Sequence, residues 1–520
     1  MKRTLAIGIS AVLAAAILLA PANVALAQSQ VEEALKVPGA KPVLPVSAAR
    51  KPFDNAFIAE ARKYWGNFHW QMGGDHALYY NTHLSEFMPM AVAPPVGDVS
   101  RLRRSPVASV KKTVFVHADG SQAIPLDEYV TNGKMRAQAV MILHRGKVVY
   151  EAYPGLDPAQ PHFWASVTKS TVGLLASMLE EQGLIDVNRP VTAYAKQLAG
   201  SQWDKVRVID ALNMAVGLDI QEDLKALTDP MSMFQRFGAA ELGVPNGNGV
   251  VETPLDVLRA AKPIAGEAPG MPSRYSTLTT KVLVYVIEGA TSRSFTDLYG
   301  EKVWSKIGAR QPFMVGVGPD GVAGAYGLGY STLEDLARYA LVFTPSWKAV
   351  SKSEVVSPRV LKALQTSGDH KAYLAGDWTR GWVGDVFGKD MPVFNSRQFD
   401  AVWADGAMFK HGNLYQGIYV DPMRDVVGVF FSTVPMTGSA DLLPGYIRQA
   451  AKNLNFEEAA AIRDQVVELK RLLVAEQPLV PEAWISKPAV PVTYQTTESA
   501  GRKSDGRPKS SRSGRSKGRR

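Results

Sequence analysis

Ser166 and Lys169 are the residues of this chain whose types and spacing point most directly to chemistry. They lie three residues apart at the start of a predicted helix, 166–182, and residues three apart share one helix face. A lysine with a lowered pKa can accept the proton of a serine hydroxyl, which makes the serine a nucleophile. The backbone N–H of Ser166, at the helix amino end, would supply half of an oxyanion hole. The alternative is a helix-terminal serine followed by a solvated lysine.

The sequence contains no cysteine, which excludes disulfides, a thiolate nucleophile and a cysteine–zinc site. His69, His76 and His83 fall seven residues apart, but Gly73-Gly74 interrupts any helix that would align them. We therefore expect no metal and no cofactor.

The amino-terminal end is typical of a signal peptide. Lys2-Arg3 precedes an uncharged stretch, 5–20, and small residues around Ala27 form a cleavage site. We expect residues 1–27 to be removed and the protein to be periplasmic or secreted.

The carboxy-terminal end is strongly basic, whereas the body is not. Residues 501–520 hold nine Lys or Arg and one Asp, so this tail carries a charge of +8, and Lys2-Arg3 adds +2. Subtracting both from the formal charge of +9 leaves residues 28–500 with a net charge of −1. The tail has too few apolar residues to bury a core, so we expect 478–520 to be a disordered linker and basic tail. Such a tail favours contact with an anionic surface rather than a specific nucleic acid, and a solubilising or incidental extension is the alternative.

Two predicted hairpins bracket the helical part of the chain. Residues 139–150 and 416–433 each alternate β-rich runs with a turn, and helices are predicted between them at 206–215, 254–261, 277–290, 294–306 and 332–343. Strands at both ends with helices between them indicate an α+β fold in which the first and last strands share one antiparallel sheet.

Five segments in this order carry a family resemblance: Ser166-Val-Thr-Lys169, 183–191, 208–217, 269–275 and 330–338. They resemble the serine β-lactamase and penicillin-binding-protein superfamily, nearest to class C-related hydrolases of the 6-aminohexanoate-dimer hydrolase branch. The resemblance implies a β-lactamase/transpeptidase-like antiparallel sheet flanked by helices, with a mostly helical lobe. It assigns the hydrolase domain to 136–450, after a linker, 28–60, and an N-terminal extension, 61–135, of unassigned role.

The resemblance also implies two further catalytic elements. Tyr275 matches the family's tyrosine, which relays a proton to the leaving group if the nearby cations lower its pKa. Thr277 stands where class C enzymes have asparagine, which weakens the β-lactamase assignment more than the hydrolase one. A buried aromatic residue is the alternative for Tyr275.

The third element is predicted at Lys410-His411-Gly412, whose backbone N–H groups would complete the oxyanion hole and bind substrate. Counting back from Gln416 instead places residues 413–415 at this position, and a plain turn before a strand is a further alternative.

These residues predict an exported serine hydrolase that forms an acyl-enzyme on Ser166 and cleaves an amide or ester of a small molecule or peptide. The alternatives are a β-lactamase, a D-alanyl-D-alanine carboxypeptidase-like enzyme and a non-catalytic binding protein with the same fold. Specificity would come from loops 218–253 and 370–408; the second holds Trp378, Trp382 and Trp403, either pocket or core residues.

Residues 451–477 resemble the UVR motif, a helical hairpin used for protein contact. The alternative is an amphipathic terminal helix, because Phe456, Ile462, Val466 and Leu469 recur at helical spacing. We expect this segment to be helical, with protein contact as its possible role.

Overall fold

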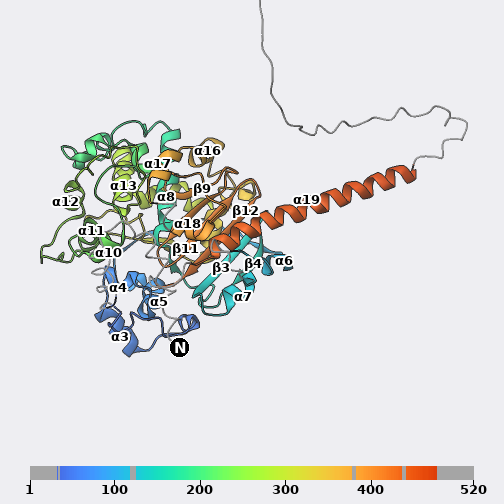
Figure 1. Ribbon diagram of the computed structural model, residues 1–520, viewed down its shortest axis with the longest axis horizontal. Coiled ribbons are helices and arrows are strands. Elements are labelled where there is room, and N and C mark those ends of the chain that lie inside the picture. The colour runs from blue at the N-terminus through green and yellow to red at the C-terminus, as the bar shows by residue number, and fades with distance from the viewer. Residues whose placement is uncertain (1–31, 33–34, 117–123, 378–381, 436–440, 477–520) are drawn as a thin grey trace, which may run out of the picture. The chain divides into compact units, whose positions relative to one another are not determined.

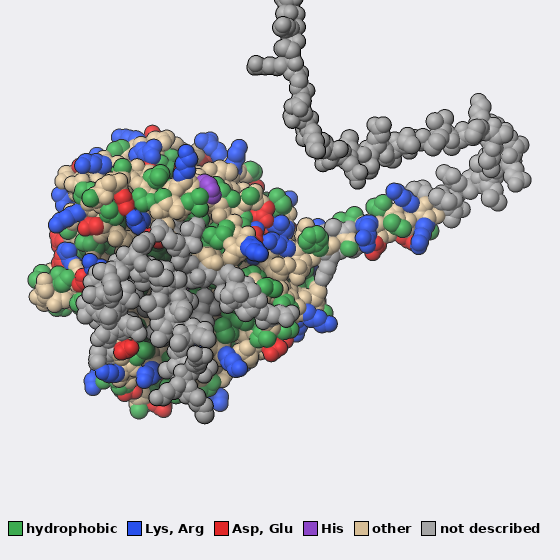
Figure 2. All heavy atoms as spheres, viewed as in Figure 1, with side chains coloured by type: hydrophobic (Ala, Val, Ile, Leu, Met, Phe, Trp, Pro, Cys, Tyr) green, Lys and Arg blue, Asp and Glu red, His purple; other side chains and the backbone are tan. Residues whose placement is uncertain are grey.

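The computed structural model describes residues 32, 35–116, 124–377, 382–435 and 441–476, so the expected signal peptide and basic tail lie outside it. The described residues up to Ala459 form one compact unit, and those from Ala460 form another. The expected N-terminal extension, 61–135, is therefore part of the first unit. On the face in Figure 2, acidic side chains lie between basic ones, in keeping with a body of little net charge.

The main sheet joins both ends of the hydrolase region (Figure 1). Strands β3 and β12 pair antiparallel, from Val426 opposite His144 to Phe431 opposite Ala139, which confirms the predicted shared sheet. Both strands are nearly continuous apolar runs because helices or loops cover both faces of the sheet. In spatial order the strands are β2 Arg103–Arg104, β4 Lys147–Ala152, β3 Ala137–His144, β12 Val426–Ser432, β11 Gln416–Asp421, β10 Met408–Gly412, β9 Phe399–Val402 and β8 Phe394–Ser396.

A second, four-stranded sheet was not predicted, since its strands are only two to four residues long. Its order is β1 Met90–Ala93, β6 Phe313–Gly316, β7 Gly329–Ser331 and β5 His162–Phe163. Strand β5 leads directly into the turn that carries Ser166, so this sheet anchors one side of the predicted site.

Six predicted helices are present, most of them shorter than expected. They are the 3-10 turn Ala165–Thr168 with α8 Lys169–Glu181, and α9 Val208–Leu212, α12 Pro254–Arg259, α13 Thr277–Thr291, α14 Phe295–Lys302 and α15 Leu333–Leu341. The remaining helices are α3 Asn55–Lys63, α4 Asn67–Gln71, α5 Asp75–Thr82, α6 Ala108–Lys111, α7 Leu126–Thr131, α10 Leu224–Thr228, α11 Met233–Leu242, α16 Pro358–Thr366, α17 His370–Ala375, α18 Trp382–Phe387 and α19 Leu443–Glu476.

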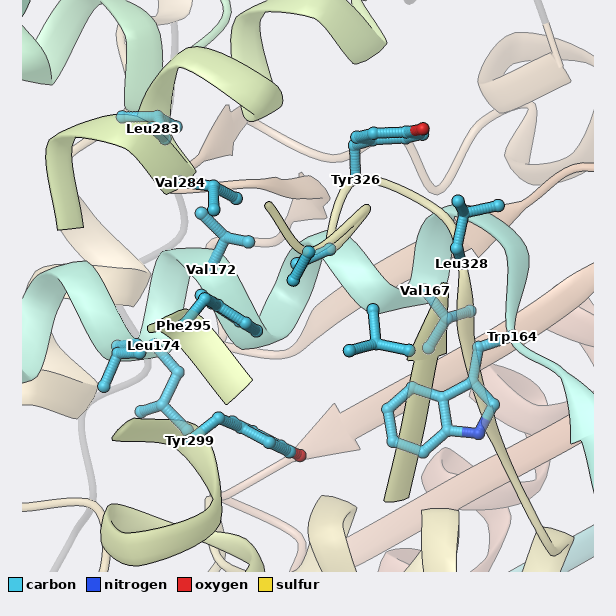
Figure 3. Packing of buried hydrophobic residues seen from close by; sticks show 14 of the residues in the cluster. Trp164, Val167, Val172, Leu174, Leu283, Val284, Phe295, Tyr299, Tyr326 and Leu328 are labelled. Carbon is cyan, nitrogen blue, oxygen red and sulfur yellow. The ribbon is translucent and has the colours of Figure 1, made fainter. Parts of the chain in front are cut away.

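Helix α8 is the buried axis of the helical lobe. Val172 on α8 faces Val284 of α13, and Leu174 faces Phe295 of α14 (Figure 3). Because α8 is held on several sides, the residues at its amino end have little freedom to move.

Part of the segment expected to be a linker is folded. Within 28–60, a 3-10 turn spans Val46–Arg50 with Val46 buried, and helix α3 begins at Asn55. Helix α4 follows and packs against α11 of the helical lobe (Figure 1). The early part of the chain thus belongs to the body of the molecule.

Helix α19 confirms helical structure over the UVR-like segment but forms one continuous helix rather than a hairpin within the described residues. In its first part, Tyr446, Ile447 and Leu454 are buried. In the second unit, Val466 and Leu469 are 43% and 59% exposed. Among the described helices, none combines the length and apolar composition needed to span a membrane.

Asp441 is expected to make folding pH-dependent. This buried carboxyl accepts hydrogen bonds from Tyr129 Oη and the Leu443 N–H at the start of α19, and burial raises its pKa to about 6. A raised carboxyl pKa stabilises the folded state below the unfolded pKa, and this contribution is lost as pH rises through 6. A rise from 3.8 corresponds to about 3 kcal/mol.

Urea unfolding of the wild type and the Asp441→Asn variant, compared at pH 4 and pH 7, tests this prediction. The wild type should lose stability relative to the variant at the higher pH. An equal difference at both pH values would contradict it.

Candidate active site

Ser166 lies on a tightly held turn between β5 and α8. The preceding residue, Ala165, has a φ of +47°, a conformation unfavourable for a residue with a Cβ atom. The turn is fixed on the β7 side: the Trp164 N–H donates to Gly329 O at 2.8 Å, and the indole donates to Ser331 Oγ at 3.0 Å. This geometry presents Ser166, which remains partly exposed.

Lys169 is fully buried, and its Nζ lies 2.9 Å from Ser166 Oγ. Two other oxygens surround the amine: Tyr326 O at 2.6 Å and Thr277 Oγ1 at 3.1 Å. A neutral amine has two N–H bonds and one lone pair. If these two oxygens accept the two protons, the lone pair is left for the Ser166 hydroxyl.

The environment favours that neutral form. Burial, with a contribution from the Lys410 ammonium, lowers the pKa of Lys169 to about 7, although Glu222 and Asp400 act in the opposite direction. Burial also raises the pKa of the nearby Glu222 carboxyl, which accepts a hydrogen bond from the Thr277 N–H. The amine can therefore exchange a proton near neutral pH.

Tyr275 lies between Lys169 and Lys410. Its ring centre is 5.0 Å from Lys169 Nζ and 4.9 Å from Lys410 Nζ, and its hydroxyl is hydrogen-bonded to Ser166. The condition set for the proton relay, a pKa lowered by the cations, is not met: burial, with Asp400 and Glu222, raises the pKa of Tyr275. The phenol thus stays protonated at neutral pH and can donate a proton.

Lys410 reaches the site from β10 and forms a buried ion pair with Asp400 of β9. Both Asp400 oxygens lie 2.7 Å from Lys410 Nζ, and both side chains are almost fully buried. The amine is also 3.4 Å from Tyr275 Oη. The pair links the strand to the tyrosine and keeps a positive charge beside it.

The structure brings Gly412 to the site but corrects the role expected for His411. A Cβ atom on Gly412 would lie 2.7 Å from Trp164 O, so the strand needs glycine to approach the Ser166 turn. The His411 N–H instead donates to Asp400 at 2.8 Å, and its ring packs edge-on to Tyr415. That N–H is therefore not available to an oxyanion.

A cavity of about 110 Å³ opens next to Ser166. Its lining includes Asn67, Trp70, Gln71 and Met88, all from the early segment whose role the sequence left unassigned. Another part of the lining comes from 218–253, as predicted, through Glu222 and residues of α11. The cavity is mainly apolar, with Trp70, Met88, Phe163, Phe234, Phe237 and Leu328 among its lining.

Among its described residues, the second predicted specificity loop, 370–408, contributes none to this lining. Trp403 is a core residue, buried against Phe387 with its indole donating to Asp390 O. Trp378 lies outside the described residues. The residues described hold no cluster of side chains suited to a metal ion.

Three site residues were not identified from the sequence. Thr277 was noted only as a departure from the family pattern, and Glu222 carries no local signal. Asp400 did carry a local signal in the sequence, because a single acidic residue within the apolar strand Phe399–Val402 is unusual unless it is paired.

The comparisons with known proteins agree with this geometry. Residues 126–452 match the family model described as Beta-lactamase, and 447–472 match the UvrB/uvrC motif. The 6-aminohexanoate-dimer hydrolase of Paenarthrobacter ureafaciens is 26% identical over 375 residues, covering 69% of this chain and 86% of that protein.

A solved structure with a TM-score above 0.5 shares the fold. A putative 6-aminohexanoate-dimer hydrolase from Bacillus anthracis has a TM-score of 0.57 at 21% identity, covering 77% of this chain and 97% of that one. A class C beta-lactamase has a TM-score of 0.44 at 15% identity, covering 63% and 93%. The resemblance and the fold class drawn from the sequence are confirmed.

Proposed function

We propose, from the premise that this chain belongs to the beta-lactamase family of serine hydrolases, that it cleaves an amide or ester of a small molecule or peptide through an acyl-enzyme on Ser166. The observation that carries the proposal is the contact between Ser166 Oγ and a buried amine whose pKa is about 7. An activated serine is the requirement for acyl transfer.

In the first half of the reaction, neutral Lys169 takes the proton of Ser166 as Oγ attacks the carbonyl carbon. The tetrahedral oxyanion rests on the backbone N–H of Ser166 and on a second backbone N–H near the end of β10, other than that of His411, which is held by Asp400. Tyr275, protonated and hydrogen-bonded to Ser166, donates its proton to the leaving amine or alkoxide and is reprotonated from Lys169.

In the second half, water attacks the acyl-enzyme and releases the acid. The same groups act in reverse order. Lys169 or Tyr275 accepts the proton of the attacking water, and Ser166 Oγ regains its proton as the acid leaves. Lys410 holds positive charge next to Tyr275 in both halves, which stabilises negative charge as it develops on the phenol.

The proposed substrate class is supported partly by the name of the relative and partly by the cavity. The relative from Paenarthrobacter ureafaciens is named a 6-aminohexanoate-dimer hydrolase, and the mainly apolar cavity beside Ser166 suits a linear or aromatic acyl group. A panel of linear amides, esters, a β-lactam and a D-alanyl-D-alanine peptide, scored by product analysis, separates the candidates. We also propose export, on the basis of residues 1–27, which fractionation of the producing cell would test.

The experiment that tests the function is covalent labelling. Incubation of the mature protein with a fluorophosphonate should add one group, and peptide mapping should place it on Ser166. The Ser166→Ala variant is the control. No adduct on a folded protein would contradict the mechanism.

The rate is expected to rise with pH. Because the pKa of Lys169 is lowered to about 7, the reactive neutral amine is a minor form at pH 6 and the major form at pH 8. The value of kcat/KM should therefore rise about tenfold per pH unit below 7 and level off near pH 8. A profile measured with a p-nitrophenyl ester checks this, and a rising limb centred near pH 10 would contradict it.

A further inference from the structure

A chain of four side-chain amides runs along the cavity wall from the end of β10 to helix α10. Asn413 Nδ2 donates to Gln71 Oε1 at 3.1 Å, and Gln71 Nε2 donates to Asn67 Oδ1 at 2.8 Å. The chain continues through Asn67 Nδ2 to Gln235 Oε1 at 3.2 Å, and Gln235 Nε2 donates to Leu227 O at 2.6 Å. Of the four amides, those of Asn67, Gln71 and Asn413 belong to cavity-lining residues.

The last link fixes the direction of every other link. A backbone carbonyl can only accept, so Gln235 must offer its NH2 group to Leu227 O and its oxygen to Asn67. The same reasoning then orients Asn67, Gln71 and finally Asn413, whose NH2 group faces Gln71 and gives it one of its two N–H bonds. The orientation of Asn413 is thus set by a carbonyl four links away.

Helix α11 leaves room for this row of hydrogen-bonded amides. A Cβ atom on Gly238 of α11 would lie 2.7 Å from Asn67 Nδ2, so glycine at this position leaves the space that the amide occupies. Glycine within a helix is unfavourable by about 1 kcal/mol relative to alanine. Its presence in α11 fits a requirement for the Asn67 side chain.

The acyl part of the substrate is the part that contacts the cavity wall formed by Asn67, Gln71 and Asn413. Ser166 lines the cavity, whereas Tyr275 and Lys410 are not among its lining residues. Since Tyr275 protonates the leaving group in the proposed mechanism, the leaving group departs on the Tyr275 side. The group that stays on Ser166 then occupies the cavity.

We infer that Asn413 is a specificity-determining residue, which accepts a hydrogen bond from an N–H group in the acyl part of the substrate. One N–H of the Asn413 amide is held by Gln71, and the Asn413 side-chain oxygen accepts no hydrogen bond from a described residue, so this oxygen is open to a donor on the ligand. The substrate class is then an N-acylated amino acid or a linear oligoamide rather than a simple fatty acyl ester. The inference rests on the proposed acyl transfer at Ser166.

The test uses p-nitrophenyl esters of N-acetylglycine, N-acetyl-4-aminobutyrate and N-acetyl-6-aminohexanoate, each paired with its N-methyl counterpart. The two members of a pair share a leaving group and differ at the N–H. In at least one pair, kcat/KM should favour the N–H ester by about tenfold, the typical effect of one neutral hydrogen bond. The turnover by Ser166→Ala is subtracted as background.

Two variants test whether Asn413 causes the preference for the N–H ester. Asn413→Leu should bring the ratio close to one, and Gly238→Ala, which disturbs the chain at Asn67 without contacting Asn413, should reduce it. A ratio below about two in all three pairs, or a preference that survives Asn413→Leu, would overturn the inference while leaving acyl transfer intact. No turnover above background for any ester would count against acyl transfer itself.

Discussion

The Lys169→Met variant is expected to lose about 10² to 10⁴-fold in kcat, the range spanned by removal of an effective general base. The Ser166 hydroxyl would keep its position but lose the only amine within hydrogen-bonding distance among the described residues. The rising limb of the pH profile near 7 should vanish with it. Steady-state kinetics with a p-nitrophenyl ester provide the measurement.

The Lys169→Arg variant is the matched control, because arginine keeps a positive charge but does not deprotonate in this pH range. If Lys169 acts as a base, both variants should be equally impaired. Retention of activity in Lys169→Arg would mean that only the charge matters. The Met variant should unfold at the same temperature as the wild type or a higher one, because a buried amine with a lowered pKa opposes folding.

The Asp400→Asn variant is expected to lower kcat by about 10²-fold, in the range seen when one preorganised electrostatic group is removed. Asp400 holds Lys410 through both carboxylate oxygens, and Lys410 in turn lies 3.4 Å from Tyr275 Oη. Without the carboxylate, the buried Lys410 amine would lose its proton more readily. Breaking the pair should also cost about 3 to 5 kcal/mol of stability.

The double variant Asp400→Asn with Lys410→Met separates these two effects. It removes both buried charges, so thermal stability should recover, since an apolar replacement of a buried pair is often neutral or stabilising. Activity should stay low because the charge beside Tyr275 is still missing. Recovery of both properties would show that the pair serves folding alone.

The sequence was informative wherever the chemistry is local. Ser166 and Lys169 share one turn of helix, and their contact follows from spacing alone. The family resemblance then supplied Tyr275 and Lys410, which lie 109 and 244 positions beyond Ser166 and meet it only through the sheet and α13.

The remaining site residues depend on packing that no short pattern encodes. The raised pKa of Tyr275 was not predicted because burial outweighs the two flanking lysines, and burial cannot be read from a motif. The His411 N–H was wrongly assigned to the oxyanion. It donates to Asp400 on a neighbouring strand, and the sequence gives no sign of such a bond between strands. The cavity wall was missed because α4 has only five residues and its Asn67 contacts Gln235 of α11 from 168 positions away.

The origin of the cavity wall has a consequence for how selectivity could change over time. The nucleophile and its base come from 166–169, whereas Asn67, Trp70, Gln71 and Met88 come from a stretch that ends before the family match begins at residue 126. Recombination within 94–125 would exchange that stretch and leave the catalytic side chains unchanged. Homologues with the same reaction and different substrates could therefore arise by inheriting a different front piece.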